Sequence, residues 1–285
     1  AVAVVRAHNP DLPVHRLPYS WRLPATAAPL ICAAFYPFTP FEAGGTVTDR
    51  SMRLPDAVST GSGTGASAGS ASASPDPVDQ AIALAAETGW ALYELPARHT
   101  VRTDTEALEA CARLAARLVR SGATVFDPGY AGGRPVTADR IAIGAAHRDQ
   151  VAGIRAALDR LGGDDRHSDR HSDPDQRDAD LRAVTVDTAN RLQGREYDVC
   201  IVLHPLSGRR DATAFHLETG RLCVLLSRHR HACVVVARAG IPELLDAHPH
   251  TEPVHLGVPV KFPDGWEAHQ AVLAHLAGYR VHAAR

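Results

Sequence analysis

One segment of the sequence concentrates long polar side chains between two apolar runs. Residues 188–198 read Thr-Ala-Asn-Arg-Leu-Gln-Gly-Arg-Glu-Tyr-Asp, and they separate the apolar runs 184–187 and 199–203. Ordinary connections are turns of glycine, proline and serine, so hydroxyl, amide, guanidinium and carboxylate groups at this density indicate a binding site. Gly194 would let a ligand approach the backbone closely. The simpler interpretation is a polar turn in which Thr188 caps a helix.

Arginines form a second group of residues that could take part in binding or catalysis. The apolar spacing of residues 220–230 predicts a helix, on which Arg221 and Arg228, seven residues apart, would share one face. Arg230 would lie about 200° round that helix from Arg228 and should point away. Arginines at a helix end are usually solvated and favoured by the helix dipole. Arg22 is a further candidate, because it ends an extended segment just before a predicted helix.

Alternating strands and helices would position these groups. Apolar runs predict strands at residues 90–95, 140–145, 184–187, 199–203 and 232–237. Amphipathic spacing predicts helices at residues 25–35, 105–119, 149–161, 220–230, 242–247 and 266–276. Strands that are apolar throughout and alternate with helices indicate an α/β fold, with a parallel sheet covered on both faces. Ligands of such sheets bind beyond the carboxyl ends of the strands, where we therefore expect the site.

Two polar segments interrupt this pattern and divide the chain. Residues 58–77 are rich in serine and glycine and predict a flexible linker, and residues 163–180 predict a disordered loop. His167 and His171, in a repeat within that loop, could be imagined as metal ligands, but we favour a solvated loop and predict no metal site. The other parts are residues 1–57 as the start of the domain, 78–247 as its main body, and 248–285 as a C-terminal extension with one helix.

Composition excludes several classes of protein. Thirty Lys+Arg against 32 Asp+Glu leave a net charge of -2, so no broadly basic surface exists and any phosphate contact must be local. Lys261 is the sole lysine and stands in Val-Lys-Phe, so the chain has no Walker A phosphate loop. Five cysteines without CxxC spacing favour reduced thiols and a cytoplasmic protein. No apolar run reaches the roughly 20 residues of a membrane span.

Four segments together resemble motifs of the second RecA-like domain of superfamily 1 DNA/RNA helicases, in the branch that includes the nonsense-mediated-decay helicase. Residues 20–23, Ser-Trp-Arg-Leu, are similar to Gln-Tyr-Arg-Met, and residues 141–150 are similar to Val-Gly-Val-Val-Thr-Pro-Tyr-x-x-Gln. Residues 188–198 are similar to motif V, Thr-x-Asp-x-x-Gln-Gly-x-Glu-x-Asp, and residues 221–230 to motif VI, Arg-Leu-Asn-Val-Ala-Leu-Thr-Arg-Ala-Lys. Motifs V and VI are the specific ones.

The likeness covers residues 12 to 240, less the two polar segments, and some positions depart from it. Asn190 stands where the family has Asp or His, and Ser227 where it has Thr. Ala146 and His147 replace the Pro-Tyr of the second motif, and Cys223 replaces the Asn of motif VI.

The resemblance implies an AAA-type ATPase with a P-loop NTPase fold, in which this chain is the second of two RecA-like domains. By motif position, Arg22 and Arg228 would be catalytic arginines at the γ-phosphate of ATP, which suits the planar, always charged guanidinium. Gln193, Gly194 and Glu196 would bind the nucleotide, and Thr188, Asn190 and His147 would contact single-stranded nucleic acid, DNA more than RNA. ATP and Mg²⁺ would be held mainly by an N-terminal RecA-like domain of the same protein, and we expect no membrane partner.

Three functions remain open on the sequence. The first is the C-terminal motor domain of an ATP-dependent helicase, which on this chain alone would be inactive because it lacks Walker A. A start without Met agrees with the chain being part of a longer protein. The second is a RecA-like module that binds nucleic acid or protein and has lost ATPase function. The third is an unrelated α/β nucleotide-binding domain, which the lack of a glycine-rich loop after a strand disfavours.

Overall fold

The computed structural model describes residues 17–55, 75–128, 132–168, 181–248 and 264–283, together with residues 8, 9, 11, 13 and 15. For residues 164–168 it describes the backbone alone. Most of the predicted linker, residues 58–74, and most of the predicted loop, residues 169–180, lie outside the described residues. His171 and Lys261 do so as well.

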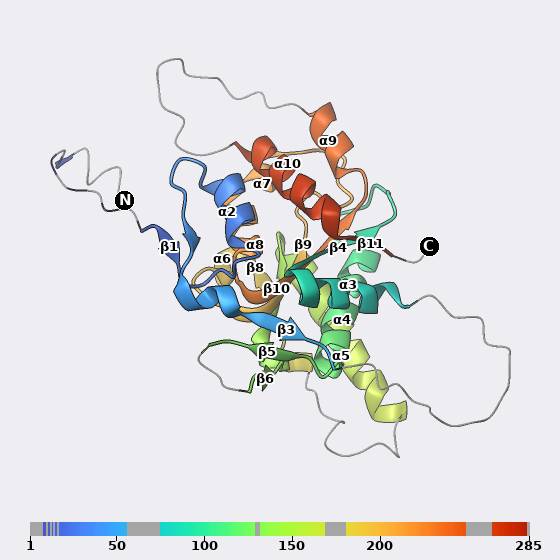
Figure 1. The fold of residues 1–285 in the computed structure, drawn as a ribbon. Coiled ribbons are helices and arrows are strands. Elements are labelled where there is room, and N and C mark those ends of the chain that lie inside the picture. The colour runs from blue at the N-terminus through green and yellow to red at the C-terminus, as the bar shows by residue number, and fades with distance from the viewer. Residues whose placement is uncertain are drawn as a thin grey trace, which may run out of the picture.

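Six parallel strands form the central sheet, in the order β11-β4-β10-β9-β7-β8 (Figure 1). They are β4 (Trp90–Leu95), β7 (Ile141–Ala145), β8 (Thr185–Thr188), β9 (Tyr197–Leu203), β10 (His229–Arg238) and β11 (Arg280–His282). The predicted α/β fold with a parallel sheet is therefore confirmed, and it is a RecA-like arrangement.

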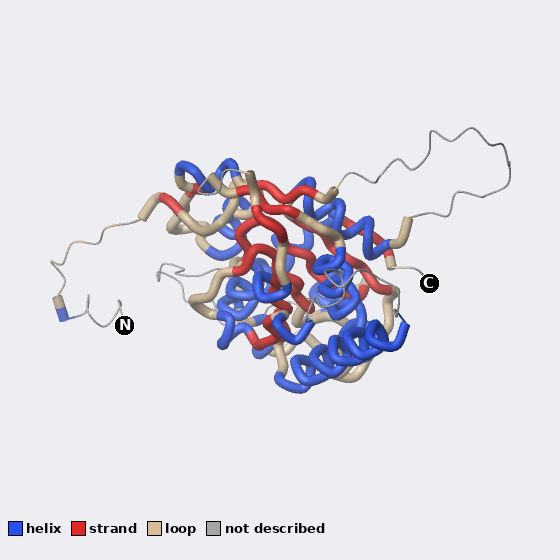
Figure 2. Tube along the Cα trace, turned by 90° about the horizontal axis from the view of Figure 1, so that it is seen from below, coloured by secondary structure: helices blue, strands red, loops and turns tan. Residues whose placement is uncertain are grey.

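Helices cover both faces of the sheet, so that the strands run between two helical layers (Figure 2). One layer consists of α3 (Pro77–Thr88), α4 (Thr105–Arg120) and α5 (Arg148–Ser168). The other contains α2 (Ala28–Phe35), α6 (Ala189–Leu192), α7 (Ala214–Leu217), α8 (Thr219–Leu226), α9 (Ile241–Ala247) and α10 (Gly265–Leu276). Along β9, Val199 and Ile201 pack into the core under the first layer, and Cys200 and Val202 into the core under the second. Strands buried on both faces explain the continuous apolar runs.

Two small sheets lie outside the central one. The strands β3 (Ser51–Arg53), β5 (Thr124–Phe126) and β6 (Arg134–Pro135) pair antiparallel, and β1 (Tyr19–Ser20) pairs with β2 (Glu42–Ala43). The described residues also form short 3-10 turns, namely η1 (Gly45–Asp49), η2 (Ala138–Arg140), η4 (Leu181–Ala183) and η5 (Ala277–Tyr279). The sequence did not predict these strands, which are two or three residues long.

The helix predicted at residues 220–230 is wrong at its C-terminal end. α8 ends at Leu226, and β10 begins at His229. His229 and His231 are buried while Arg230 is partly exposed, which is the period of two that a strand shows. The strand period therefore prevails over the helical spacing from residue 229 onward. Arg221 and Arg228 do not share one helix face.

Other element ends also differ from the prediction. α5 continues through Ser168, six residues into the predicted loop 163–180. α3 was not predicted, although Asp76 caps it by accepting from the amide of Val78, and Gly89, at φ 84°, ends it.

The C-terminal extension contains its predicted helix and, in addition, a strand that was not predicted. β11 pairs with β4 and becomes the outer strand of the central sheet. α10 packs against α2 and meets α7, where Gly265 comes so close to the Leu217 carbonyl that a Cβ would overlap it. The extension is thus part of the domain. All five cysteines are free, and no helix in the described ranges is long and apolar enough to cross a membrane.

Candidate functional site

Most of the predicted site residues line one of two cavities. The arginine cleft, of about 550 Å³, is lined by Leu17, Tyr19, Ser20, Trp21, Arg22, Leu23, Ile31, Tyr36, Phe41, Glu196, Cys223, Ser227 and Arg228. The histidine pocket, of about 460 Å³, is lined by Ala146, His147, Arg148, Val151, Asp187, Thr188, Ala189, Asn190, Arg191, Phe215 and Arg221.

The two cavities lie at opposite edges of the central sheet. Asp187 and Val202 both align with Gly144 of β7, so Thr188 lies at the carboxyl edge. Glu196 stands just before β9, six residues and about 20 Å below Val202. Arg228 likewise comes just before β10. The histidine pocket therefore lies at the carboxyl ends of the strands, where we expected the site, and the arginine cleft lies at their amino ends.

The connection between β8 and β9 joins the two cavities. It runs from Thr188 through α6 and an exposed turn to Glu196, so motif V reaches from one edge of the sheet to the other. Gln193 and Gly194 lie in that turn and line neither cavity. Gly194 has φ 83°, a conformation that disfavours any side chain.

Arg228 is buried in the arginine cleft without a carboxylate partner among the described residues. It is 8% exposed, and its guanidinium donates to Ser227 Oγ at 2.7 Å. Its Nε is buried and makes no hydrogen bond. Burial, followed by repulsion from Arg22, lowers the pKa of Arg228. A buried, incompletely bonded cation is unfavourable unless an anion approaches it.

Arg22 and Glu196 form an ion pair at the mouth of this cleft, with Arg22 Nε 3.0 Å from Glu196 Oε1. Arg230 approaches the same carboxylate, with Nη1 3.6 Å from Oε2, and its Nη2 lies 2.5 Å from Asp127 Oδ2. The expectation that Arg230 points away is therefore wrong. It rested on a helix, whereas Arg230 belongs to a strand.

Aromatic and thiol side chains to which the sequence analysis gave no binding role complete the cleft. Trp21 is 65% exposed beside Arg22, and Tyr36 lies near Cys223. Burial, with Cys223 nearby, raises the pKa of Tyr36 to about 12, and burial also raises the pKa of the Cys223 thiol. Both groups are therefore neutral near pH 7, and Glu196 is the one carboxylic acid among the described residues that line the cleft. An exposed tryptophan next to an arginine was the available sequence signal.

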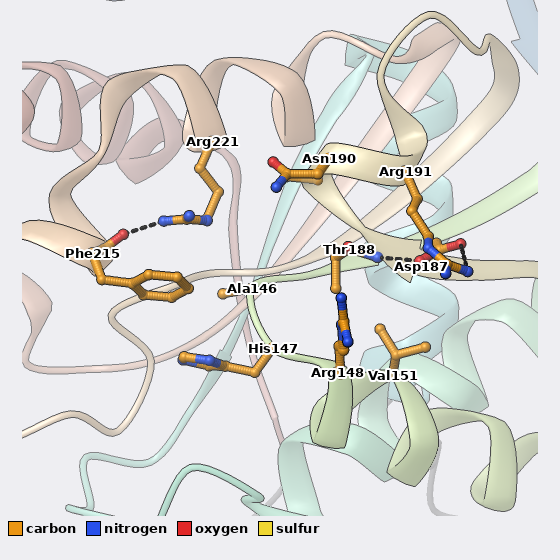
Figure 3. A pocket seen from close by; sticks show the side chains of 11 residues that line it. Ala146, His147, Arg148, Val151, Asp187, Thr188, Asn190, Arg191, Phe215 and Arg221 are labelled. Atoms are coloured by element: carbon orange, nitrogen blue, oxygen red, sulfur yellow. Dashed lines mark hydrogen bonds and ion pairs between the residues drawn. The ribbon is translucent and has the colours of Figure 1, made fainter.

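The histidine pocket has a wall made of a three-layered stack. Figure 3 shows the ring of Phe215 between Arg221 and His147. The His147 and Phe215 rings are stacked with centroids 4.8 Å apart, and Arg221 Cζ lies 3.7 Å from the Phe215 ring centre. Arg221 also donates to the Phe215 carbonyl. Arg221 thus belongs to this pocket rather than to the cleft of Arg228. Phe215 comes from α7, which the sequence did not predict.

Neutral imidazoles hold this wall in place. His147 Nε2 lies 3.1 Å from His216 Nε2, and His216 Nδ1 lies 2.7 Å from Thr213 Oγ1. Only one proton can lie between the two facing nitrogens if neither ring is charged. Burial lowers the pKa of His147, and it lowers the pKa of His216 to about 4. Both rings are therefore uncharged near pH 7.

The opposite wall carries Thr188 and Asn190, with Arg148 and Arg191 around them (Figure 3). Asp187 Oδ1 accepts from the Thr188 amide at 2.8 Å and lies on the same strand end. The structure thus brings His147, Thr188 and Asn190 together, as the sequence predicted. A hydroxyl, an amide and three arginines suit phosphate oxygens.

Among the residues that the structure describes, no group of three or more His, Cys, Asp or Glu could hold a metal ion. The side chains of His167 and His171 lie outside the described residues, so the interpretation of that repeat stays a prediction.

The comparisons with known proteins identify the domain. A family model described as an AAA domain matches residues 80–240, which is more than half of the chain. No curated protein matches the chain. The match contains Thr188, Glu196 and Arg228, and Arg22 precedes it. The chain therefore belongs to this AAA-domain family and contains a RecA-like domain of the helicase-type ATPases.

Proposed function

We propose that this chain is the C-terminal motor domain of an ATP-dependent superfamily 1 helicase, in the branch of the nonsense-mediated-decay helicase. Its arginine cleft would meet the γ-phosphate of an ATP held by an N-terminal RecA-like domain of the same protein. Its histidine pocket would contact one strand of nucleic acid, DNA more than RNA. The family match supports an ATPase function. The two separate cavities support one site for ATP and another for nucleic acid.

The observation that carries the proposal is Arg228. Its guanidinium is buried, lacks a carboxylate among the described residues, and faces a cleft that also contains Arg22. Two arginines that repel each other around one carboxylate leave an excess of positive charge. A phosphate anion would relieve that repulsion and occupy the unused donors of Arg228.

The residues of the cleft fit a nucleotide in three respects. Arg22 and Arg228 can donate to phosphate oxygens, and such arginines stabilise the charge that develops as a phosphoryl group is transferred. Trp21 offers an exposed indole face against which a base can stack. Glu196 can accept from a sugar hydroxyl. Gln193 and Gly194 line neither cavity, and their proposed contact with the nucleotide rests on motif position alone. ATP would supply the γ-phosphoryl group. The N-terminal RecA-like domain would hold most of the ATP and Mg²⁺ contacts.

The histidine pocket fits a phosphate backbone. Thr188 and Asn190 would donate to phosphate oxygens, with His147 at the facing wall. Such contacts follow the backbone and carry no sequence information, in agreement with a net charge of -2 that excludes broad electrostatic binding.

ATPase assays on a protein that also holds the N-terminal RecA-like domain test this proposal. Arg228→Lys should lower kcat strongly and KM little, because the single ammonium keeps the charge and loses the planar fork. Wild-type turnover that single-stranded nucleic acid stimulates supports a motor domain. Wild-type binding of a strand without any turnover would instead point to the RecA-like module that has lost ATPase function.

A further inference from the structure

Five charged residues close a ring beside the arginine cleft. Arg22 Nε lies 3.0 Å from Glu196 Oε1, and Arg230 Nη1 lies 3.6 Å from Glu196 Oε2. Asp127 Oδ2 accepts from Arg230 Nη2 at 2.5 Å and from Arg50 Nε at 2.9 Å. Arg50 Nη1 then donates to the Arg22 carbonyl at 2.5 Å, which closes the ring on the residue where it began. We refer to these residues as the ion-pair ring.

The antiparallel sheet explains how Arg50 and Asp127 meet. Ser51 of β3 pairs with Phe126 of β5, and strands that run in opposite directions place the preceding Arg50 opposite the following Asp127. The side chains are 6% and 13% exposed. An ion pair with this burial is screened little by solvent, and removing Asp127 would leave Arg50 without its carboxylate partner. The pair is therefore a firm support.

Arg50 acts on the backbone that carries Arg22. Its Nη1 binds the Arg22 carbonyl, and its Nη2 lies 3.5 Å from the Trp21 carbonyl. Residues 21 and 22 follow β1 in a bend and do not pair with another strand. Strand pairing therefore does not hold their backbone in place. Arg50 thus holds the bend from which the Arg22 side chain extends into the cleft.

The ring also gives Glu196 two arginine partners. If Arg22 leaves Glu196 to bind a phosphate, Arg230 still faces that carboxylate. Arg22 can therefore move without leaving an unpaired acid behind, which lowers the cost of the movement.

We infer that Arg50 and Asp127 are positioning residues for Arg22, which they aim at a phosphate in the arginine cleft. This inference rests on the proposed function, because it assigns Arg22 a phosphate to bind. Neither Arg50 nor Asp127 touches the ligand, and both act through Arg22 and Arg230.

A measurement without ligand tests the positioning directly. Nuclear magnetic resonance follows solvent exchange of the Arg22 Nε–H, assigned by its loss in an Arg22→Lys spectrum. Arg50→Ala should speed this exchange roughly tenfold, because the charged hydrogen bond to Glu196 loses its support. Arg117→Ala is the control, since Arg117 forms an ion pair with Asp79, between helices α4 and α3, and neither residue belongs to the ion-pair ring. Unchanged exchange in a folded Arg50→Ala protein would overturn the inference.

Titration of inorganic tripolyphosphate tests the consequence. Arg22→Ala should weaken binding roughly tenfold, and Arg50→Ala nearly as much. The double variant should bind little worse than Arg22→Ala, because both changes remove one contact. Effects that multiply would overturn the positioning role. If wild type takes up no tripolyphosphate, the proposed function fails instead, and the exchange measurement alone decides the role of Arg50.

A second variant guards against a folding defect. Asp127→Asn keeps the shape of the side chain and removes its charge, so it should produce the same exchange and binding changes as Arg50→Ala, in weaker form. If Arg50→Ala does not fold, Asp127→Asn decides the question, and wild-type exchange and tripolyphosphate binding in that variant would overturn the inference.

Discussion

The arginine cleft and the histidine pocket differ in how their charges are handled. The cleft holds permanent cations, of which Arg22 pairs with a carboxylate of the ion-pair ring and Arg228 has no carboxylate partner among the described residues. The pocket wall holds imidazoles that burial keeps neutral, stacked beside Phe215. Because the two lie at opposite edges of one sheet and one connection joins them, the difference suggests two ligand tasks. Ligand binding in the cleft should depend on where the guanidinium groups lie. Ligand binding in the pocket should depend on how the rings pack and whether the imidazoles are protonated.

The largest expected effect concerns the cleft. In a protein with both RecA-like domains, Arg228→Lys and Arg22→Ala should each lower ATP turnover, by on the order of 10³-fold for the lysine variant. The double variant should raise the activation free energy of turnover by less than the two single variants added together, because both arginines would stabilise one transition state. Steady-state kinetics of the single and double variants measure this. Arg117→Lys is the control, and an equal loss there would break the comparison.

The next effect concerns pH and two buried histidines that line neither cavity. Burial lowers the pKa of His269 to about 4 and of His229 to about 3, against 6.5 when unfolded. Below pH 6.5 the unfolded chain therefore binds more protons. Stability is fully present above pH 6.5 and should fall toward pH 4, by about 1.4 kcal/mol per pH unit for each histidine.

Urea unfolding between pH 7 and 5 checks this dependence. His229→Phe should flatten it, since His229 packs edge-on against Trp90 and its two ring nitrogens make no hydrogen bond. The exposed His99→Gln should leave the slope as in wild type, and a slope that His229→Phe does not change would remove the buried imidazoles as its cause.

A smaller effect is expected for nucleic acid. Thr188→Ala should weaken binding of a fluorescent single strand roughly three- to tenfold, because one hydrogen bond to phosphate is lost. Thr185→Ala, on the same strand but outside the pocket, is the control. Anisotropy titrations with DNA and RNA measure both variants, and equal losses for the two threonines would argue against a contact at Thr188.

The smallest signal is expected from this chain by itself. Without a Walker A lysine it should hydrolyse no ATP above a protein-free blank. Turnover that purifies with the chain and disappears in Arg228→Ala would contradict a role that depends on another domain.

Much of the fold could be predicted because buried parallel strands leave plain traces. The run at residues 90–95 corresponds to β4, and 199–203 lies within β9, since strands apolar on both faces need no other signal. The end of α8 could not be predicted, because no glycine or proline stands between Leu226 and His229. β11 has a single buried residue, Val281, and offers no pattern.

Which residues meet at each site could be predicted better than where in the sheet each site lies. Thr188, Asn190 and His147 do meet, as do Arg22, Glu196 and Arg228. Spacing within motif V could not reveal that Thr188 and Glu196 lie at opposite edges, because this depends on how α6 crosses the sheet. Arg50 and Asp127 are 77 residues apart in sequence and meet only through strand pairing.

The central claim is that the cleft and the pocket are separate sites, and paired arginine substitutions test it most directly. Arg228→Lys and Arg221→Lys are each titrated with tripolyphosphate and with a labelled single strand. The account predicts that Arg228→Lys weakens tripolyphosphate binding roughly tenfold and spares the strand, whereas Arg221→Lys weakens strand binding and spares tripolyphosphate. Loss of both ligands in both variants, or the reverse assignment, would contradict it.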